Sequence, residues 1–343
     1  TCFKLSQEPQ APYMGDLPKC RFQVGKAFQE VGVDLAGPFL IKESLRRKAA
    51  LGKAYLCVFI CMTSKAVHLE VVSSCSTPAF LAALDRFLSR RGCPTRIHSD
   101  CGSNFLGASR EMKEILAWYH QQQTSDAIIE HLTPRGIEWS FNPPASPHFG
   151  GLWEAAVKSS KAIFKRISGS TPLSFEELTT LFSRIEAILN SRPICPLNND
   201  PGSLVALTPG HLLIGAPLTA RPELPLLELP ENRLSRWQLV QQRIQHYWKR
   251  FKSEYFHHLQ QRNKWTKKHP NLEVGDLVVL KANSAPTQWI LGRVQEVFPG
   301  KDGVLRVVEI RTAHGVLLRP VTKLVSLRPI TDPESTPPSS SKS

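Results

Sequence analysis

The sequence lacks the patterns that mark several common classes of protein. Its eight cysteines form no CxxC pair, and no cluster of His and Cys offers a zinc site. Because this usage is typical of reduced thiols, we expect an intracellular, reducing compartment rather than a disulfide framework. No Gly-rich phosphate loop suggests an NTPase. No signal peptide is visible, and the longest apolar run, residues 54–62, is far shorter than the roughly 20 residues of a membrane span. We therefore expect neither a zinc ion nor a membrane partner.

Acidic residues are scarce relative to basic ones. The chain of 343 residues holds 43 Lys and Arg against 29 Asp and Glu, a net charge of +14. More than half of this excess lies in residues 236–268, where nine basic residues accompany Glu254 as the single acidic one. A charge of that size and distribution favours a polyanion partner, above all DNA.

The chain is long enough for two or three domains, and its patterning changes along its length. Residues 1–27 are polar and irregular. Residues 28–215 predict an α/β fold, a mixed five-stranded sheet with flanking helices. We expect its strands at 30–38, 54–62, 66–72, 95–99 and 137–141, and its helices at 78–91, 108–120, 152–167 and 174–190.

Local signals set several of these boundaries. The pair Gly37-Pro38 should stop the first strand. The short joint at 63–65 predicts that the next two strands form an antiparallel hairpin. Thr77 should cap the first helix, and Ser174 with Glu177 predicts a capping box for the last one.

The rest of the chain differs in composition. Residues 216–234 are rich in Pro and Leu and predict a linker, and residues 235–268 predict a long basic helix. Alternating apolar residues within 269–330 predict a small antiparallel β-barrel of about five strands. The Pro- and Ser-rich tail, residues 331–343, should be disordered.

Three acidic residues stand where a metal site could form. Asp34 lies inside an apolar strand, where a carboxylate is costly unless it is paired or bound to a metal. Asp100 follows a strand whose C-terminal end is a usual place for ligands. Glu154 opens the helix after the loop 142–151. Each has an ordinary alternative: a strand-end cap for Asp34, an Asp-x-Gly turn for Asp100, and a partner of the helix dipole for Glu154.

Three lysines share a helix face with Glu154. Lys158, Lys161 and Lys165 follow it at i+4, i+7 and i+11. One carboxylate and three lysines suit a phosphate backbone next to a metal, and the alternative is a solvated face with an ion pair. Together the three acids fit a site for two Mg²⁺ (or Mn²⁺) ions, because these ions take carboxylate oxygens and substrate phosphate as ligands.

Four stretches carry a family resemblance. They are residues 31–38 (VGVDLAGP), 97–108 (IHSDCGSNFLGA), 141–158 (FNPPASPHFGGLWEAAVK) and 207–215 (LTPGHLLIG). They resemble the integrases of BEL/Pao-type long-terminal-repeat retrotransposons, and the second and third stretches are specific. The resemblance covers nearly the whole chain. One position departs from it, since Cys101 stands where the family usually has Asn.

This resemblance implies an RNase H-like catalytic core with the triad Asp34, Asp100 and Glu154, followed by an SH3-like C-terminal domain at 269–330. It implies a Mg-dependent polynucleotidyl transferase that trims the 3′ ends of element DNA and joins them to target DNA, acting as a homo-oligomer in the nucleus. Residues 1–27 would then follow an upstream zinc domain, with Cys2 as its last ligand. The alternative is a domesticated or inactive copy that binds DNA or chromatin.

Further residues are candidate DNA contacts. Phosphate contacts of this kind are salt-dependent and blind to sequence. For the basic side of the long helix, the alternative to DNA binding is a face that is only exposed to solvent. In the C-terminal domain, Trp289 is a candidate DNA contact and equally a candidate core residue. The other candidates there are Arg293, Arg306, Arg311 and Arg319. The main candidates are Asn142, His148, Lys158, Lys161, Lys165, Arg243, Lys249, Arg250 and Lys252.

Overall fold

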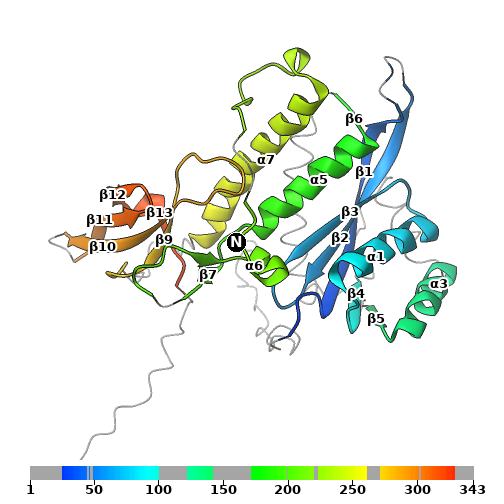
Figure 1. The fold of residues 1–343 in the computed structure, drawn as a ribbon, viewed down its shortest axis with the longest axis horizontal. Helices are drawn as coiled ribbons and strands as arrows, with labels where there is room; N and C mark the ends of the chain where they lie inside the picture. The colour runs from blue at the N-terminus through cyan, green and yellow to red at the C-terminus, as the bar shows by residue number, and fades with distance from the viewer. Residues whose placement is uncertain are drawn as a thin grey trace, which may run out of the picture.

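The computed structural model describes residues 25–44, 46, 49–99, 122–141, 171–198, 200–219, 223–260, 271–300 and 303–328. Within these ranges the chain forms two large sheets, with long helices packed against the first and between the two (Figure 1). None of the described helices combines the length and the apolar character needed to cross a membrane.

The first sheet is mixed and has the strand order β3-β2-β1-β4-β5. Its strands are β1 (Glu30–Lys42), β2 (Leu51–Cys61), β3 (Val67–Val72), β4 (Arg96–Ser99) and β5 (Glu138–Phe141). β1 pairs antiparallel with β2 and parallel with β4, and the short β6 (Leu173–Ser174) pairs with the end of β1. The mixed five-stranded α/β sheet predicted from the sequence is confirmed, and so is the β2–β3 hairpin.

The prediction that the first strand stops at Gly37-Pro38 is wrong, because β1 continues beyond these residues. The peptide bond between these residues is cis, the register shifts between Ala36 and Phe39, and pairing with β2 then resumes as far as Lys42. Gly37 has a φ of +140°, and a Cβ there would lie 2.8 Å from the Tyr55 ring. Glycine therefore permits a bulge that bends the strand without ending it. The β1–β2 hairpin consequently projects beyond its neighbours (Figure 1).

Helices cover both faces of the first sheet. α1 (Thr77–Arg91) and α3 (Gln122–Leu132), followed by the 3-10 turn η3 (Thr133–Arg135), pack on one face through residues such as Phe87 and Ile128. α5 (Phe175–Asn190) and α7 (Arg236–Leu259) cover the other face. The cap of α1 is Ser76 rather than the expected Thr77: its Oγ accepts from the backbone N–H of Ala79 at 3.4 Å.

Two capping boxes fix the starts of the long helices. In α5 the Ser174–Glu177 box is present as predicted. In α7 the box is formed by Ser235 and Gln238. The residues before α7, which include the 3-10 turn η4 (Glu231–Arg233), are held against it, since the Gln242 side chain donates to the carbonyl of the buried Leu226 at 2.8 Å.

The second sheet is antiparallel, with the order β12-β11-β10-β9-β13. Its strands are β9 (Leu277–Leu280), β10 (Leu291–Pro299), β11 (Leu305–Thr312), β12 (Gly315–Pro320) and β13 (Leu324–Ser326), with the 3-10 turn η5 (Val321–Lys323) before β13. Five antiparallel strands were predicted here. The segment between α5 and α7 adds the small β7 (Cys195–Pro196) and β8 (Ala206–Leu207) ladder and α6 (Pro209–Ile214).

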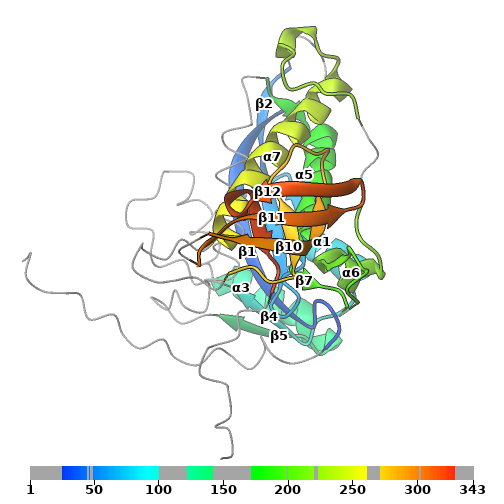
Figure 2. The ribbon, with the colours of Figure 1, turned by 90° about the vertical axis from the view of Figure 1, so that its left-hand side faces the viewer.

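α7 connects the two sheets, and the second sheet lies in front of it in Figure 2. Trp289 is the centre of this junction, with its ring centroid 4.9 Å from that of Trp248 and 5.4 Å from that of Tyr255. Its indole N–H donates to Ser191 Oγ at 3.2 Å. The Trp248 indole N–H donates to the carbonyl of Ser284 at 2.8 Å. The junction is therefore a packed aromatic core rather than a flexible connection.

Candidate active site

Asp34 lies on the central strand of the first sheet, between β2 and β4. It is opposite Val58 and one residue beyond the Val33–Ser99 pair. Its side chain is half-buried. Burial raises the pKa of the neighbouring Cys57 thiol, and the negative charge of Asp34 raises it further. Asp34 therefore places a carboxylate at the point where the parallel β1–β4 pairing ends.

β4 and β5 end in register beside Asp34. Ser99 pairs with Val33 on one side and with Phe141 on the other. The Trp139 indole N–H donates to Ser99 Oγ at 3.0 Å, which fixes the end of β4 against β5. The next residues along the chain are Asp100 and Asn142. The described sheet thus ends just before two of the predicted site residues, at the carboxyl ends of parallel strands where ligands commonly bind.

The other predicted site residues lie outside the described ranges. Within those ranges, no group of three His, Cys, Asp or Glu side chains could hold a metal ion. Asp34 is the one member of the triad that they include, so the complete metal site stays a prediction. The residues outside are Asp100, Asn142, His148, Glu154, Lys158, Lys161 and Lys165.

Two basic residues of α7 that are predicted DNA contacts form hydrogen bonds to oxygens of the protein itself. Arg243 is 3% exposed, and its guanidinium donates to the carbonyl of Thr171 at 2.6 Å. The Lys252 ammonium donates to the carbonyl of Ala282 at 2.5 Å and to Ser284 Oγ at 3.0 Å. Burial lowers the pKa of Lys252 to about 8. Both cations are held by protein oxygens, Arg243 is buried and Lys252 is half-buried, and their contact with DNA stays a prediction.

Lys249 and Arg250 are exposed and stay candidate DNA contacts. Arg250 lies 3.5 Å from Glu254, one helical turn later. His246 and His257 are exposed at helical spacing on the same side of α7. The outward face of this helix is therefore basic but narrower than the sequence indicated.

The candidate DNA contacts of the second sheet also divide into residues that are packed against the protein and residues that are exposed. Trp289 is part of the junction core. Arg293 and Arg311 donate to backbone carbonyls of residues 200–203, and Arg293 is buried. The arginines that are exposed are Arg306 and Arg319.

The basic end of the β1–β2 hairpin was not predicted as a functional site from the sequence. Lys53 and Arg46 are exposed there, and Lys42 is half-buried. The available signal is a local run of basic residues, with Glu43 as the single acidic one within residues 42–53, between two predicted strands. These basic residues are Lys42, Arg46, Arg47, Lys48 and Lys53.

A cavity of about 460 Å³ lies between the 191–219 segment and the second sheet. Its walls are mostly apolar and include Leu204, Leu218, Leu291 and Trp289. Among the described residues that line it there is no acidic side chain, and Asp34 is not one of them. We therefore do not identify this cavity as the active site.

Residues 44–147 match the family model described as the integrase core domain, and residues 235–327 match a family of unknown function, DUF5641. Neither match covers half of the chain. Asp100 lies within the first match, whereas Asp34 and Glu154 lie outside it. No curated protein sequence matches the chain.

Two solved structures are similar at low identity. One is a chain in the cryo-EM structure of the simian T-cell lymphotropic virus intasome in complex with PP2A regulatory subunit B56 gamma. It is 14% identical with a TM-score of 0.33, and the alignment covers 88% of this chain and 79% of that chain. The other is the catalytic core domain of BIV integrase, 13% identical with a TM-score of 0.35, over 55% of this chain and 95% of that chain.

Proposed function

We propose that this chain is the catalytic and C-terminal part of a BEL/Pao-type retrotransposon integrase. It would trim the 3′ ends of element DNA with water as nucleophile and then use the freed 3′-hydroxyl to attack target DNA. The substrates are the element ends and the target DNA, and the compartment is the nucleus. The chain would act as a homo-oligomer, and its second sheet would be the SH3-like C-terminal domain.

One observation carries the proposal. Asp34 stands on β1 immediately after Val33, which pairs with Ser99, and Asp100 follows Ser99 in the chain. The residues that directly precede two of the three predicted ligands are therefore paired with each other in the sheet. The match of residues 44–147 to the integrase core domain supports the same reaction class.

The residues that would hold the metal are Asp34, Asp100 and Glu154. Carboxylate oxygens are the ligands that Mg²⁺ and Mn²⁺ favour, and the half-buried carboxylate of Asp34 on a central strand fits this role. When bound, two ions activate the attacking oxygen and stabilise the leaving one. The chain itself contributes position: β1 carries Asp34, and β4 ends at Ser99, the residue before Asp100.

A strand-transfer assay with Mg²⁺ or Mn²⁺ tests the triad. Asp34→Asn, Asp100→Asn and Glu154→Gln should each lower turnover by roughly 100-fold or more, because each removes a charged ligand. Glu138→Gln is the matched control. Glu138 lies on the neighbouring β5, its side chain is 61% exposed and it pairs with Arg96 at 2.7 Å, so its loss should leave turnover within about twofold.

Two outcomes contradict the catalytic proposal. Turnover that survives all three triad substitutions would remove these residues from the active site. If the unmodified protein shows no strand transfer but binds DNA with strong salt dependence, the chain is an integrase-derived DNA-binding protein.

A further inference from the structure

The outer face of the second sheet is covered at one end and open at the other. Near β9, Leu277 and Val279 pack with Phe256 of α7. In the next row Arg293 and Arg311 lie opposite each other and donate to the carbonyls of residues 200–203. Beyond this row β10, β11 and β12 project from the molecule (Figures 1 and 2).

The open part combines acidic and apolar side chains. Glu296, Glu309 and Leu318 are direct neighbours across β10, β11 and β12. Leu318 is 57% exposed, and the next row contributes the exposed ring of Phe298. We call this surface the acidic patch, and it consists of Glu296, Phe298, Glu309, Val316 and Leu318.

The acidic patch lies on the side of the sheet away from its core. Alternate residues of a strand point to opposite faces, and Val308 and Ile310, on either side of Glu309, are buried in the core. Glu296 and Glu309 are directly opposite each other, where like charges repel. Neither forms an ion pair with a described residue. The patch would repel a phosphate backbone, whereas a cationic partner would relieve the repulsion.

The β1–β2 hairpin carries the complementary pattern. Leu40 is paired with Lys53, and Lys42 is paired with Leu51. Cross-strand partners and residues two apart share a face, so all four lie together, opposite the buried Ile41. Leu40 is 62% and Leu51 56% exposed. We call these four residues the hairpin face.

The spacings of the two surfaces agree. Diagonal neighbours such as Lys42 and Lys53 lie about 7–8 Å apart, and directly opposed residues such as Glu296 and Glu309 about 5 Å apart. Long lysine side chains can span that difference and place one ammonium on each carboxylate. Leu40 and Leu51 then face the apolar part of the acidic patch around Leu318.

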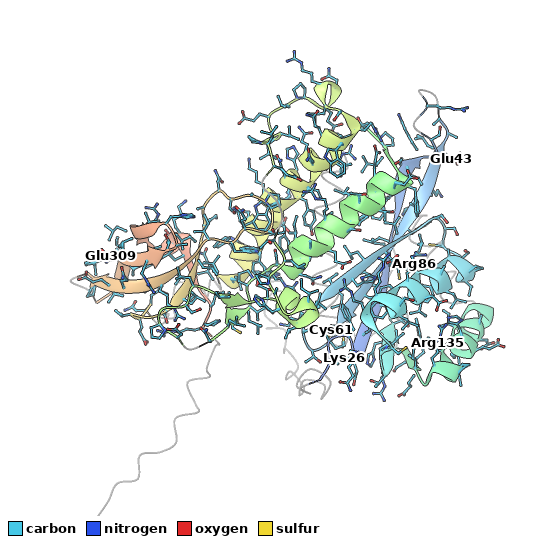
Figure 3. All side chains as sticks on the ribbon, in the orientation of Figure 1. Lys26, Glu43, Cys61, Arg86, Arg135 and Glu309 are labelled. Carbon is cyan, nitrogen blue, oxygen red and sulfur yellow. The ribbon has the colours of Figure 1, made fainter. Side chains whose placement is uncertain are left out.

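We propose that the hairpin face of one copy of this chain binds the acidic patch of a second copy. Within one molecule the two surfaces lie at opposite ends, as the labels Glu43 and Glu309 in Figure 3 show. The contact is therefore heterologous, head to tail, and each copy keeps one free surface for the next. This inference rests on the proposed homo-oligomer but not on catalysis.

Sedimentation velocity of the whole chain, without DNA or metal, tests the contact separately from strand transfer. The unmodified protein should associate as its concentration rises, and less so at high salt. The double variant Lys42→Glu/Lys53→Glu should associate roughly tenfold or more weakly, and so should Glu296→Lys/Glu309→Lys, because each places like charges in contact.

Mixing the two double variants is the most specific test of the contact. Each mixed contact again joins a basic surface to an acidic one, so the mixture should associate as the unmodified protein does. A misfolded variant would not recover in this way. The charge-matched control is Lys281→Glu/Lys323→Glu, at exposed sites near the other edge of the same sheet, and it should associate normally.

Three results would overturn the proposal. One is a monomer at every concentration. Another is unchanged self-association of either double variant, or a mixture that stays dissociated. The third is a hairpin variant that loses binding to duplex DNA while its self-association is unchanged, which would assign the hairpin face to DNA.

Discussion

Asn190 is a buried side chain that replaces a missing backbone partner. It ends α5, and its Nδ2 donates to the carbonyl of Val67 at 2.7 Å while its Oδ1 accepts from the N–H of Val67 at 2.8 Å. Glu186, one turn earlier, accepts from the N–H of Leu69 at 2.8 Å. β3 is an edge of the first sheet, and these two side chains satisfy polar groups that an edge strand otherwise leaves open.

Asn190→Leu should destabilise the protein by about 2–4 kcal/mol, because it leaves the N–H and carbonyl of Val67 buried without partners. Urea unfolding should show a lower midpoint with an unchanged slope. Asn232→Leu makes the same change at an exposed site and should stay within about 0.5 kcal/mol of the unmodified protein. Equal stability of the two variants would mean that Asn190 does not support β3.

His68 is a buried titratable residue between two carboxylates. Its Nε2 lies 3.2 Å from Glu70 and its Nδ1 3.4 Å from Glu186. Burial opposes the charged ring, and so does the Arg91 guanidinium, whose Nε lies 3.3 Å from Nδ1. The hydrogen bonds to Glu186 and Glu70 prevail and raise the pKa of His68 above its usual 6.5. The folded state therefore binds this proton more tightly than the unfolded chain does, so the stabilisation is full below pH 6.5 and is lost as the pH rises through the folded pKa.

His68→Gln should consequently cost most at low pH. The difference in unfolding free energy between the unmodified protein and this variant should shrink as the pH is raised above 6.5, measured by urea unfolding at several pH values. His258→Gln, at an exposed site of α7, should give a smaller and flatter difference. A cost of His68→Gln that is constant with pH would show that the ring is not protonated in the folded protein.

At the scale of the element, the start of α5 was readable from the sequence and the path of β1 was not. The Ser174–Glu177 capping box is a contact across three residues, so the sequence alone identifies where α5 begins. Whether Gly37-Pro38 ends a strand or bulges it depends on the register with β2, a contact made by a separate segment. Local signals carry no information about that register.

The burial of individual α7 side chains was likewise not readable from the local sequence. Helical periodicity predicts one buried face, but α7 packs on the first sheet, on residues 224–229 and on the second sheet. Much more than one face is therefore covered, and Arg243 is buried with it. For the candidate site, the strand positions predicted from the sequence put Asp34 inside one strand and Asp100 directly after another. The pairing of the residues before them, Val33 and Ser99, is known only from the structure, and Glu154 lies outside the described residues.

At the scale of the whole molecule, α7 belongs to both halves. Val240 and Tyr247 pack in the core of the first sheet, and Phe256 packs with the second sheet. The family match of residues 235–327 likewise spans α7 and the second sheet together. An interface built from buried apolar side chains couples the two halves, so we expect them to unfold as one cooperative unit.

Trp289→Ala tests this coupling. The ring packs against Trp248, Phe251, Tyr255 and Phe256. Its removal should cost about 3–5 kcal/mol and split the single calorimetric transition into two, since the second sheet would lose its anchor while its own core of residues such as Val308 and Ile310 stays intact.

Trp237→Ala is the matched control for Trp289→Ala, because Trp237 begins the same helix but is 58% exposed. It should change stability by less than about 1 kcal/mol and leave one transition. If Trp289→Ala lowers the melting temperature but keeps a single transition, the two halves are coupled through other contacts, such as those of Arg293 with residues 200–203. The position of the second sheet relative to Asp34 would then depend on that polar contact and should become sensitive to salt, which the same calorimetry at two ionic strengths measures.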